Sequence, residues 1–512
     1  LQAIVDAAAP NSVIYLNGTN YTAKPGESNV IINKSITIIG GSEADPSLIA
    51  TLDAKGQSRI FNIGSGSNVT FKNLTFINGN ANNGGAIRGG IFCKINVEGS
   101  TFINTTSNGY GGAIYSTMGG VTVFNSTFIN TTSSNNGGAI YSNESSITVS
   151  NSTCKNTTTI QGGGGAICSD NSGTILVSGS TFEDTTSKWI GGTIFSTGNV
   201  TVIDSTFKNT TSKMAGGTIF STNNVTVIDS TFINNTAGTL GGAIYNTKGN
   251  IYVLNSNFIN NSAKDGGASI YSNSVLNVKD STFNSPNSNG TAIIYLKSSN
   301  NANVNLTNNN ISSNLLAIYN DGAKFISPIS LKFDDIATEE GKIVNLTAIL
   351  TDDNGNIIGS KTSIAGKVNN TDVHYEFNDT TKKFSALYQP LVKGTYKITG
   401  NYSKATNCTV INGTLFVGNP TAVDIILNPT ETIIGDIVKV TGTTVNITDG
   451  SNITIYVNGK EVGIVSVNST GGFVYDLNTD NCTIGFNNIT AKYEGSETTI
   501  ASNATATLTV NA

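Results

Sequence analysis

One repeat constrains what this chain can fold into. A Gly-Gly-Ala/Thr-Ile element returns about every 25 residues, and a second element, usually Ser-Thr-Phe with Asn two residues after the aromatic, keeps step with it. The first element begins at Gly84, Gly111, Gly137, Gly164, Gly191, Gly216 and Gly241, with looser copies at Gly266 and Gly290. The second is centred on Phe76, Phe102, Phe128, Cys154, Phe182, Phe207, Phe232, Phe258 and Phe283. Self-similarity at such a period is typical of solenoids.

The segments between the two elements predict strands. Residues 121–124, 200–203 and 225–228 are short alternating runs rich in β-branched side chains and bounded by Asn, Ser or Gly. The Leu-, Ala- or Glu-rich faces of helical repeats are missing. We therefore predict an all-β fold whose main part is a right-handed parallel β-helix, with coils stacked at roughly 4.8 Å.

Stacking of identical positions predicts a structural ladder of asparagines. Asn tolerates left-handed backbone at a turn, and its amide can bond to the amide of the next coil. The predicted ladder comprises Asn104, Asn130, Asn156, Asn209, Asn234 and Asn260, with Asp184 in the same register.

The start of the chain predicts a cap. Residues 1–9 place Leu1, Ile4, Val5 and Ala8 at helical spacing before Pro10. The terminal coil of a solenoid otherwise exposes apolar side chains and an unpaired strand edge. We expect a short amphipathic helix over that end.

The opening LQAIVDAAAPNSVIYLNGTNY, followed by INKSITIIGG, resembles that of pectin-lyase-like parallel β-helices, in particular adhesin-like surface proteins of methanogenic archaea. The GGAI and FINN elements also resemble repeats of chlamydial polymorphic outer-membrane proteins, although most coils here read F-x-N-T and no autotransporter barrel follows. This resemblance covers residues 1–325 and implies a surface protein.

The repeat ends near Tyr319, and the character of the chain changes by Pro328. The segments 326–418 and 419–512 each carry alternating strands and hairpin signals, such as DDNGN at 352–356. Their length suits an immunoglobulin-like sandwich, and both resemble the bacterial-type immunoglobulin-like modules of adhesin stalks. We predict domains at 1–325, 326–418 and 419–512.

Composition favours an exported surface. The net charge is −5, charged residues make up 12%, and no basic block occurs, so a nucleic-acid partner is not expected. Roughly thirty Asn-x-Ser/Thr sequons are present. No apolar run is long enough to insert into a membrane. The chain opens without Met, and we expect a processed piece of an extracellular, cell-surface or cell-wall protein.

Parallel β-helices often host polysaccharide lyases or glycosidases, so an enzyme of this kind is one alternative for the chain. A glycosidase needs converging carboxylates, and a lyase needs a Ca²⁺ cluster with a basic residue. Asp204, Asp229 and Asp280 share a register that elsewhere holds Asn, which favours a solvated polar row. The sole histidine, His374, falls in a sandwich strand. We predict no enzyme activity, no cofactor and no metal site.

Two further registers give residue-level predictions. The residue after the aromatic predicts Glu183 stacked between Lys155 and Lys208. The residue after Gly-Gly-Ala-Ile is mostly aromatic, and alternation places the Ile in the lumen and the aromatic outside. This outer aromatic stripe is either a binding platform or a ladder that stabilises coil contacts; it comprises Tyr115, Tyr141, Phe195, Phe220, Tyr245 and Tyr271.

The cysteines number five, an odd count for an exported chain. Cys154 replaces the Phe of its coil and Cys168 replaces the following aromatic, which hints at a disulfide within one repeat. The same alternation turns Cys154 inward and Cys168 outward, too far apart for a bridge. Both readings stay open, and Cys408 and Cys482 are expected to be unpaired.

The leading hypothesis is a non-enzymatic adhesin, with a β-helix head on an immunoglobulin-like stalk, binding a glycan or protein of another cell. The alternative is a self-associating subunit of an extracellular fibre or cell-wall layer. A third possibility is a polysaccharide lyase or glycosidase. Regular filaments of the purified protein would favour the fibre subunit, and turnover of cell-wall glycans would favour the enzyme.

Overall fold

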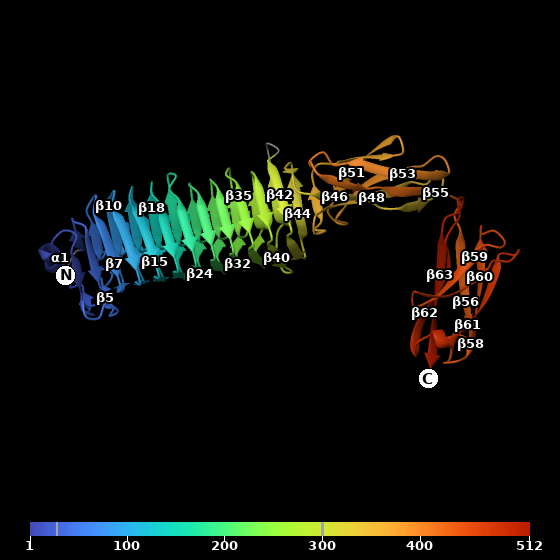
Figure 1. Ribbon diagram of the computed structural model, residues 1–512, viewed down its shortest axis with the longest axis horizontal. Coiled ribbons are helices and arrows are strands. Elements are labelled where there is room, and N and C mark those ends of the chain that lie inside the picture. The colour runs from blue at the N-terminus through green and yellow to red at the C-terminus, as the bar shows by residue number, and fades with distance from the viewer. Residues whose placement is uncertain (27–28, 298–301) are drawn as a thin grey trace.

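The computed structural model describes residues 1–26, 29–297 and 302–512. It confirms the all-β prediction, since the described helices are α1 (Gln2–Ala7) and a 3-10 turn at Thr479–Asn481. Figure 1 shows a long solenoid continued by one β-sandwich, with a second sandwich turned steeply away from both.

Each central coil passes through four short strands. An example consists of β23 (Ile175–Ser178), β24 (Thr181–Glu183), β25 (Thr186–Ser187) and β26 (Ile194–Ser196), after which β27 (Val200–Ile203) begins the next coil. The coils stack into four parallel sheets. Sheet A runs from β1 (Val13–Tyr15) to β45 (Lys324–Phe325), sheet B from β2 (Tyr21–Thr22) to β43 (Asn310–Ser313), sheet C from β3 (Val30–Ile32) to β49 (Ile358–Ser360), and sheet D from β9 (Asn80–Ala81) to β37 (Ser262–Ala263).

The lumen is filled by the repeating apolar positions. The phenylalanines of the second element pair in register and stack face to face, with ring centroids 4.6 Å apart for Phe102 and Phe128 and 4.9 Å apart for Phe232 and Phe258. The Ile of each Gly-Gly element is also fully buried, as Ile194 and Ile219 illustrate. Alternation in the strands thus produces one continuous core along the axis.

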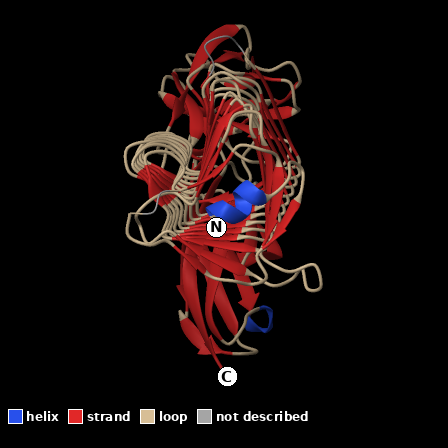
Figure 2. Ribbon diagram, turned by 90° about the vertical axis from the view of Figure 1, so that its left-hand side faces the viewer, coloured by secondary structure: helices blue, strands red, loops and turns tan. Residues whose placement is uncertain are grey.

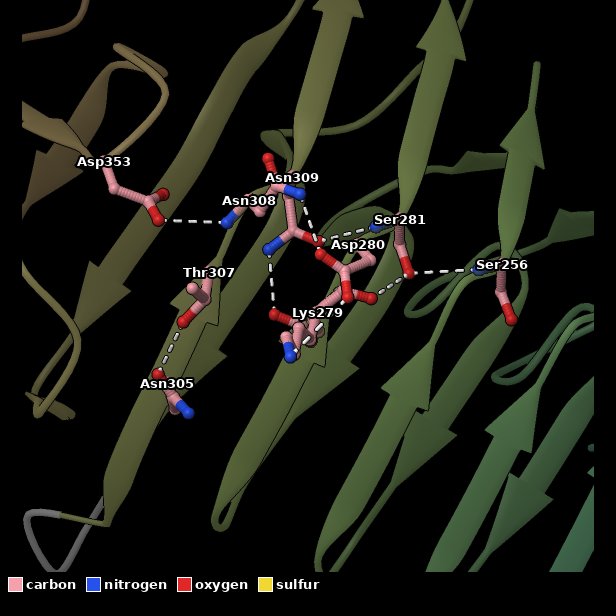
Figure 3. Close-up of polar contacts among 10 residues, drawn as sticks. Ser256, Lys279, Asp280, Ser281, Asn305, Thr307, Asn308, Asn309 and Asp353 are labelled. Atoms are coloured by element: carbon pink, nitrogen blue, oxygen red, sulfur yellow. Dashed lines mark hydrogen bonds and ion pairs between the residues drawn. The ribbon is translucent and has the colours of Figure 1, made fainter.

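The serine before each Thr-Phe pair makes a second ladder, which the sequence analysis did not anticipate. Ser281 Oγ accepts a hydrogen bond from the backbone N–H of Ser256 at 3.1 Å and donates one to the carbonyl of Lys279 at 2.9 Å. At the last coil Asn309 replaces serine, and its side-chain oxygen accepts from the N–H of Ser281 at 3.1 Å (Figure 3). Buried backbone donors at each corner are satisfied in this way.

The N-terminal end is capped as predicted. Val5 of α1 is fully buried in the core, and Leu1 and Ala8 pack against it. Lys34 Nζ donates to the carbonyls of Asp6 and Ala8 at the helix C-terminus, at 3.0 and 2.8 Å. Figure 2 shows α1 lying across the end of the solenoid. The prediction was wrong for Ile4, which is 41% exposed because a helix this short turns only one edge to the core.

The C-terminal end is closed by the first sandwich. Its strand β49 adds to sheet C beside β44 (Leu316–Asp321), pairing Ile318 with Ile358 and Tyr319 with Gly359. Asp353 accepts a hydrogen bond from the N–H of Asn308 at 2.9 Å (Figure 3). The lumen and the first sandwich share one hydrophobic core. The boundary expected after residue 325 is therefore crossed by a strand and by the core.

The sandwiches are antiparallel apart from a few parallel edge pairs. The first has the strand order β47-β55-β53-β50-β51-β52-β48-β46-β54. Its strands are β46 (Ile329–Phe333), β47 (Ile336–Thr338), β48 (Val344–Asp352), β50 (Ile364–Val368), β51 (Thr371–Asn378), β52 (Lys383–Tyr388), β53 (Gly394–Asn401), β54 (Cys408–Ile411) and β55 (Gly413–Val417).

The second sandwich has a separate core that includes Val440, Ile455 and Leu508. It packs a sheet of β56 (Ala422–Asn428), β58 (Ile437–Val445) and β61 (Gly472–Asn478) against one of β57 (Glu431–Ile433), β63 (Ser502–Asn511), β62 (Gly485–Tyr493), β59 (Asn452–Val457) and β60 (Lys460–Ser466). The connection to the first sandwich is short, with an isolated bridge between Asn419 and Thr499.

Candidate binding site

The outer aromatic stripe lies on sheet C, on the side away from the lumen. Its rings pack on one another along the axis: Phe220 and Tyr245 have centroids 5.2 Å apart, and Tyr245 and Tyr271 5.3 Å apart. Tyr141 and Phe195 belong to a hydrophobic cluster distinct from the core. Alternation therefore sends Ile and aromatic to opposite sides of the strand, as expected.

Half of the predicted stripe is covered, while Tyr115, Phe220 and Tyr245 are half-buried. Tyr141, Phe195 and Tyr271 are only 6%, 6% and 5% exposed. The loops that follow sheet D fold over them, and Ile190 of one such loop is buried in the same cluster. Figure 2 shows these loops stacked coil upon coil along one side of the solenoid. The loops therefore cover Tyr141, Phe195 and Tyr271, and a binding role of the stripe stays a prediction.

The loops carry an exposed apolar patch of their own. Ile160, Trp189 and Met214 follow β21 (Thr158–Thr159), β25 and β29 (Thr211–Ser212), which are neighbours in sheet D. Their exposures are 52%, 43% and 45%. Trp189 stands edge-on to Phe195 with centroids 6.0 Å apart, so the stripe supports the patch from beneath. This loop-edge patch was missed because its residue types differ from coil to coil and no repeat marks them.

The stripe continues beyond the residues predicted for it. Tyr295 stacks on Tyr271 at 4.9 Å, and Tyr319 stacks on Tyr295 at 5.1 Å. The Ile-Tyr pairs at 294–295 and 318–319 were the available signal; the first follows the looser copy at Gly290, and the second has no glycine before it. The tyrosine ladder thus reaches the junction with the first sandwich.

A cavity of about 260 Å³ lies where the ladder ends. This junction cavity is lined by Tyr319, Ser360, Lys361, Ser363, Glu376, Phe377 and Asp379. Lys361 is paired with Asp321 at 3.6 Å. Burial raises the pKa of Tyr319, and the negative charges of Asp379 and Asp321 raise it further. Tyr319 is thus a neutral hydroxyl facing acidic side chains.

In the middle of the stripe, Tyr141 forms a hydrogen bond with the carboxylate of Asp170. The Tyr141 hydroxyl donates to Asp170 at 3.0 Å, and Asn136 donates to the same oxygen at 3.2 Å. Burial raises the pKa of Tyr141, and the negative charge of Asp170 adds to the effect. Cys168 lies in the same cluster, where burial likewise raises its pKa well above the ordinary thiol value.

The asparagine ladder sits at a turn in left-handed backbone. Asn104, Asn130 and Asn156 have φ of 53°, 54° and 53°. Asn130 donates its amide to Asn104 at 3.1 Å, and Asn156 donates to Asn130 at 3.2 Å. Asn209 donates to Asp184 at 3.1 Å, and Asn234 lies 3.5 Å from Asn209. Asn260 shares the left-handed turn, with φ of 49°, but its buried side-chain oxygen has no partner among the described residues.

The predicted charge ladder is confirmed. Glu183 accepts from Lys155 at 3.0 Å and from Lys208 at 3.1 Å, one contact to each carboxylate oxygen. The hydrogen bonds from the two lysines lower the pKa of Glu183. All three side chains lie on the surface of sheet B, which supports the coil alignment made from the sequence.

The cysteines are free thiols in the structure, so the bridge between Cys154 and Cys168 is not formed. Cys154 is part of the lumen core and Cys168 part of the outer cluster. The two side chains lie on opposite sides of the coil wall, as the alternation of strand residues predicts, so they are too far apart for a bridge. Burial raises the pKa of both thiols.

Across the described ranges, no group of three or more His, Cys, Asp or Glu side chains has an arrangement that could hold a metal ion. Asp229, one of the aspartates weighed as catalytic, accepts a hydrogen bond from Asn255 at 2.6 Å within a row of left-handed turns. None of the helices in the part of the chain that the structure describes has the length and apolarity of a membrane span.

No protein-family model matches the chain, and no curated protein matches it. Solved structures give distant likenesses to parts of it. The fibronectin(III)-like modules of CbhA from Clostridium thermocellum share 14% identity over 35% of this chain and 94% of that chain, with a TM-score of 0.19. The adhesin InvE of Yersinia pseudotuberculosis shares 13% identity over 35% of this chain and 58% of its own, with a TM-score of 0.14. The Escherichia coli adhesin FdeC shares 13% identity over 37% of this chain and 67% of its own, with a TM-score of 0.16. Likenesses this low decide nothing about binding, and the proposals below rest on the chain's own geometry.

Proposed function

We propose that this chain is a non-enzymatic cell-surface adhesin, in which the solenoid is the binding head and the sandwiches form its stalk. The partner is a glycan or protein on another cell surface. The site of action is extracellular. The observation that carries the proposal is the loop-edge patch: an exposed tryptophan, methionine and isoleucine on the loops of adjacent coils, with the tryptophan held against Phe195.

Exposed apolar side chains that cluster mark interaction sites more often than single ones do. Tryptophan is enriched among residues that dominate binding energy. Trp189 is held by contact with Phe195, so it loses little side-chain freedom on binding. A stacked solenoid also holds the patch on a rigid frame, which supports recognition of a surface.

Closure of both solenoid ends supports a head over a fibre subunit. Growth of a filament by coil-on-coil stacking would need an unpaired terminal coil. Here α1 covers one end and β49 pairs at the other. Lateral association of rods is the remaining route to a fibre.

The test is binding of the full chain to intact cells and to immobilised cell-wall preparations. We expect Trp189→Ala to weaken binding at least tenfold. Tyr252→Ala is the matched control, since Tyr252 is 40% exposed on β35 (Ile251–Leu254) of sheet A, away from the patch. Regular filaments of the purified protein in electron micrographs would favour the fibre subunit instead, and turnover of uronate or cell-wall glycans would favour the enzyme.

A further inference from the structure

We propose that the loop-edge patch binds an acidic polysaccharide, with Trp189 packing on a sugar ring and Lys188 and Lys213 pairing with its carboxylate or sulfate groups. This rests on the proposed adhesin function and names the class of partner for the same site. Two observations carry it: exposed lysines lie beside the sole tryptophan of the chain, and uncharged polar side chains continue the same row of loops.

Sheet D fixes the order of these loops along the axis. Thr159, Ser187 and Ser212 are in-register partners at the ends of their strands, so the residues that follow them stack in the same order. The N–H of Met214 donates to the carbonyl of Trp189 at 2.8 Å, which continues the register into the loops. The first residue after each strand forms one row and the second forms another. The two rows read Ile160, Lys188, Lys213 and Gln161, Trp189, Met214.

Lys188 and Lys213 give the patch a positive charge. Both are exposed, and neither side chain forms an ion pair or a hydrogen bond with any described residue. Farther along the row Lys264 is followed directly by Asp265, so its charge is balanced locally. In a chain whose net charge is −5, two uncompensated lysines on neighbouring coils attract anionic groups. Because successive coils are roughly 4.8 Å apart, the pair suits a linear polymer with acidic groups along its length.

Trp189 supplies the apolar contact. Its ring stands edge-on to Phe195, and 43% of the residue is exposed. Support from beneath restricts the ring, so little side-chain freedom is lost when its exposed surface packs on the C–H face of a pyranose ring. Gln161, beside it in the row, is exposed, and its side-chain amide has no partner among the described residues. That amide offers both donors and an acceptor to sugar hydroxyls.

The surroundings of Trp189 favour a saccharide over other anionic partners. A lipid surface is bound by apolar side chains that enter the acyl boundary, whereas Trp189 rests against Phe195 and projects only in part. A stable protein interface covers about 800 Å² on each partner. Here the apolar row ends after two residues, at Gln161 on one side and at Thr239 on the other, where the Thr239 N–H donates to the Met214 carbonyl.

The sole tryptophan makes the patch its own reporter in the full 512-residue chain. The emission of Trp189 is recorded during titration with polygalacturonate, which carries carboxylates, with dextran sulfate, which carries sulfates, and with uncharged dextran. We expect an acidic polymer to change the emission and dextran to leave it unchanged. A response to only one acidic polymer supports the assignment and identifies the anionic group. Added sodium chloride should weaken the binding, because exposed charges are screened.

The double variant Lys188→Gln/Lys213→Gln should weaken this binding at least tenfold. Trp189→Ala, followed by calorimetric titration because it removes the fluorophore, should do the same. The matched control is Lys94→Gln/Lys248→Gln, which removes two exposed lysines that are also unpaired among the described residues. Lys94 begins β11 (Lys94–Glu98) of sheet A, and Lys248 lies in the turn before β35, so both are away from the patch.

Equal affinities of the Lys188/Lys213 variant and the control variant would overturn the assignment. So would equal responses to dextran and to the acidic polymers. Binding of polyglutamate, or of phosphatidylglycerol vesicles, as tight as that of the polymers would show a peptide or membrane site instead.

Binding of the same variants to cells separates the two proposals. If Trp189→Ala reduces cell binding and the Lys188/Lys213 variant does not, the adhesin proposal stands and the acidic-polysaccharide assignment fails. If no cell surface is bound but an acidic polymer is bound through Lys188 and Lys213, the assignment stands and the adhesin proposal fails.

Discussion

Asn320 of the last solenoid strand donates a hydrogen bond of 2.8 Å to the hydroxyl of Tyr402 in the first sandwich, and both side chains are fully buried. The same hydroxyl donates to Ser360 at 2.8 Å. Burial raises the pKa of Tyr402 to about 12, even though the hydrogen bonds with Ser360 and Asn320 act to lower it. The contact joins two parts of the chain that sequence patterns treat as separate.

Tyr402→Phe removes that hydroxyl and leaves a buried amide hydrogen and Ser360 without their partner. We expect a loss of about 1–3 kcal/mol in the free energy of unfolding, seen in urea melts of the full chain. Tyr396→Phe is the control, because the Tyr396 hydroxyl bonds to the carbonyl of Val392 at an exposed site. Because one core spans both parts, the solenoid and the first sandwich should lose stability together. Equal effects of the two variants would contradict this.

Much of the solenoid could be predicted, because coil stacking turns a repeat in the sequence directly into a repeat in space. The register of Glu183 with its two lysines followed from alignment alone. The closure by β49 could not, since three residues of a sandwich segment carry no repeat that marks them as part of sheet C. The burial of Tyr141 and Phe195 could not be predicted either, because the loops that cover these rings have no repeated sequence.

Gly217→Ala tests the close approach of coils at the second glycine of the repeat. A Cβ at Gly217 would overlap the carbonyl oxygen of Gly242 in the next coil. We expect a loss of about 3 kcal/mol or misfolding, because backbone has to shift to make room. Gly120→Ala is the matched control, since its nearest atom is Ser146 O at 4.0 Å and its φ is not in the left-handed region. The thermal unfolding midpoints of both variants measure the effect. An unchanged midpoint for Gly217→Ala would contradict the close approach of the coils at this position.

Ser205→Ala tests the serine ladder. Ser205 Oγ accepts from the N–H of Ser180 at 3.1 Å and donates to the carbonyl of Ile203 at 2.8 Å. Loss of the hydroxyl leaves the buried N–H of Ser180 unsatisfied, at a cost of about 1–3 kcal/mol. Thr122→Ala, at an exposed position of sheet A, should change the free energy of unfolding by less than about 0.5 kcal/mol. Faster amide exchange at Ser180 would identify the cause.

Glu183 should add a pH-dependent contribution to stability. Its pKa is lowered from 4.5 by hydrogen bonds from Lys155 and Lys208. The folded state therefore favours the charged carboxylate, so the contribution is present above the ordinary glutamate pKa and is lost as the pH falls through the lowered value. Glu183→Gln should remove this component from a series of unfolding midpoints against pH. High salt should shrink the difference between the two proteins, because the pairs are on the surface.

A thiol titration tests the cysteine assignment. The denatured, unreduced chain should react at five thiols, and a count of three would restore a disulfide. In the folded protein Cys154 and Cys168 should react slowest, because both are fully buried and burial raises the pKa of each. Cys408 is less buried and should react first.

The two end closures leave the length of the solenoid free to vary between them. Neither α1 nor β49 contacts the middle coils, and each central coil meets only its two neighbours. In-frame duplication or loss of one repeat unit in the gene would therefore move the stalk by roughly 4.8 Å relative to the N-terminus without disturbing either closure. Recombination between near-identical repeats would thus change the length of the solenoid. The junction cavity would keep its structure, because the residues that line it belong to the last coil and the first sandwich.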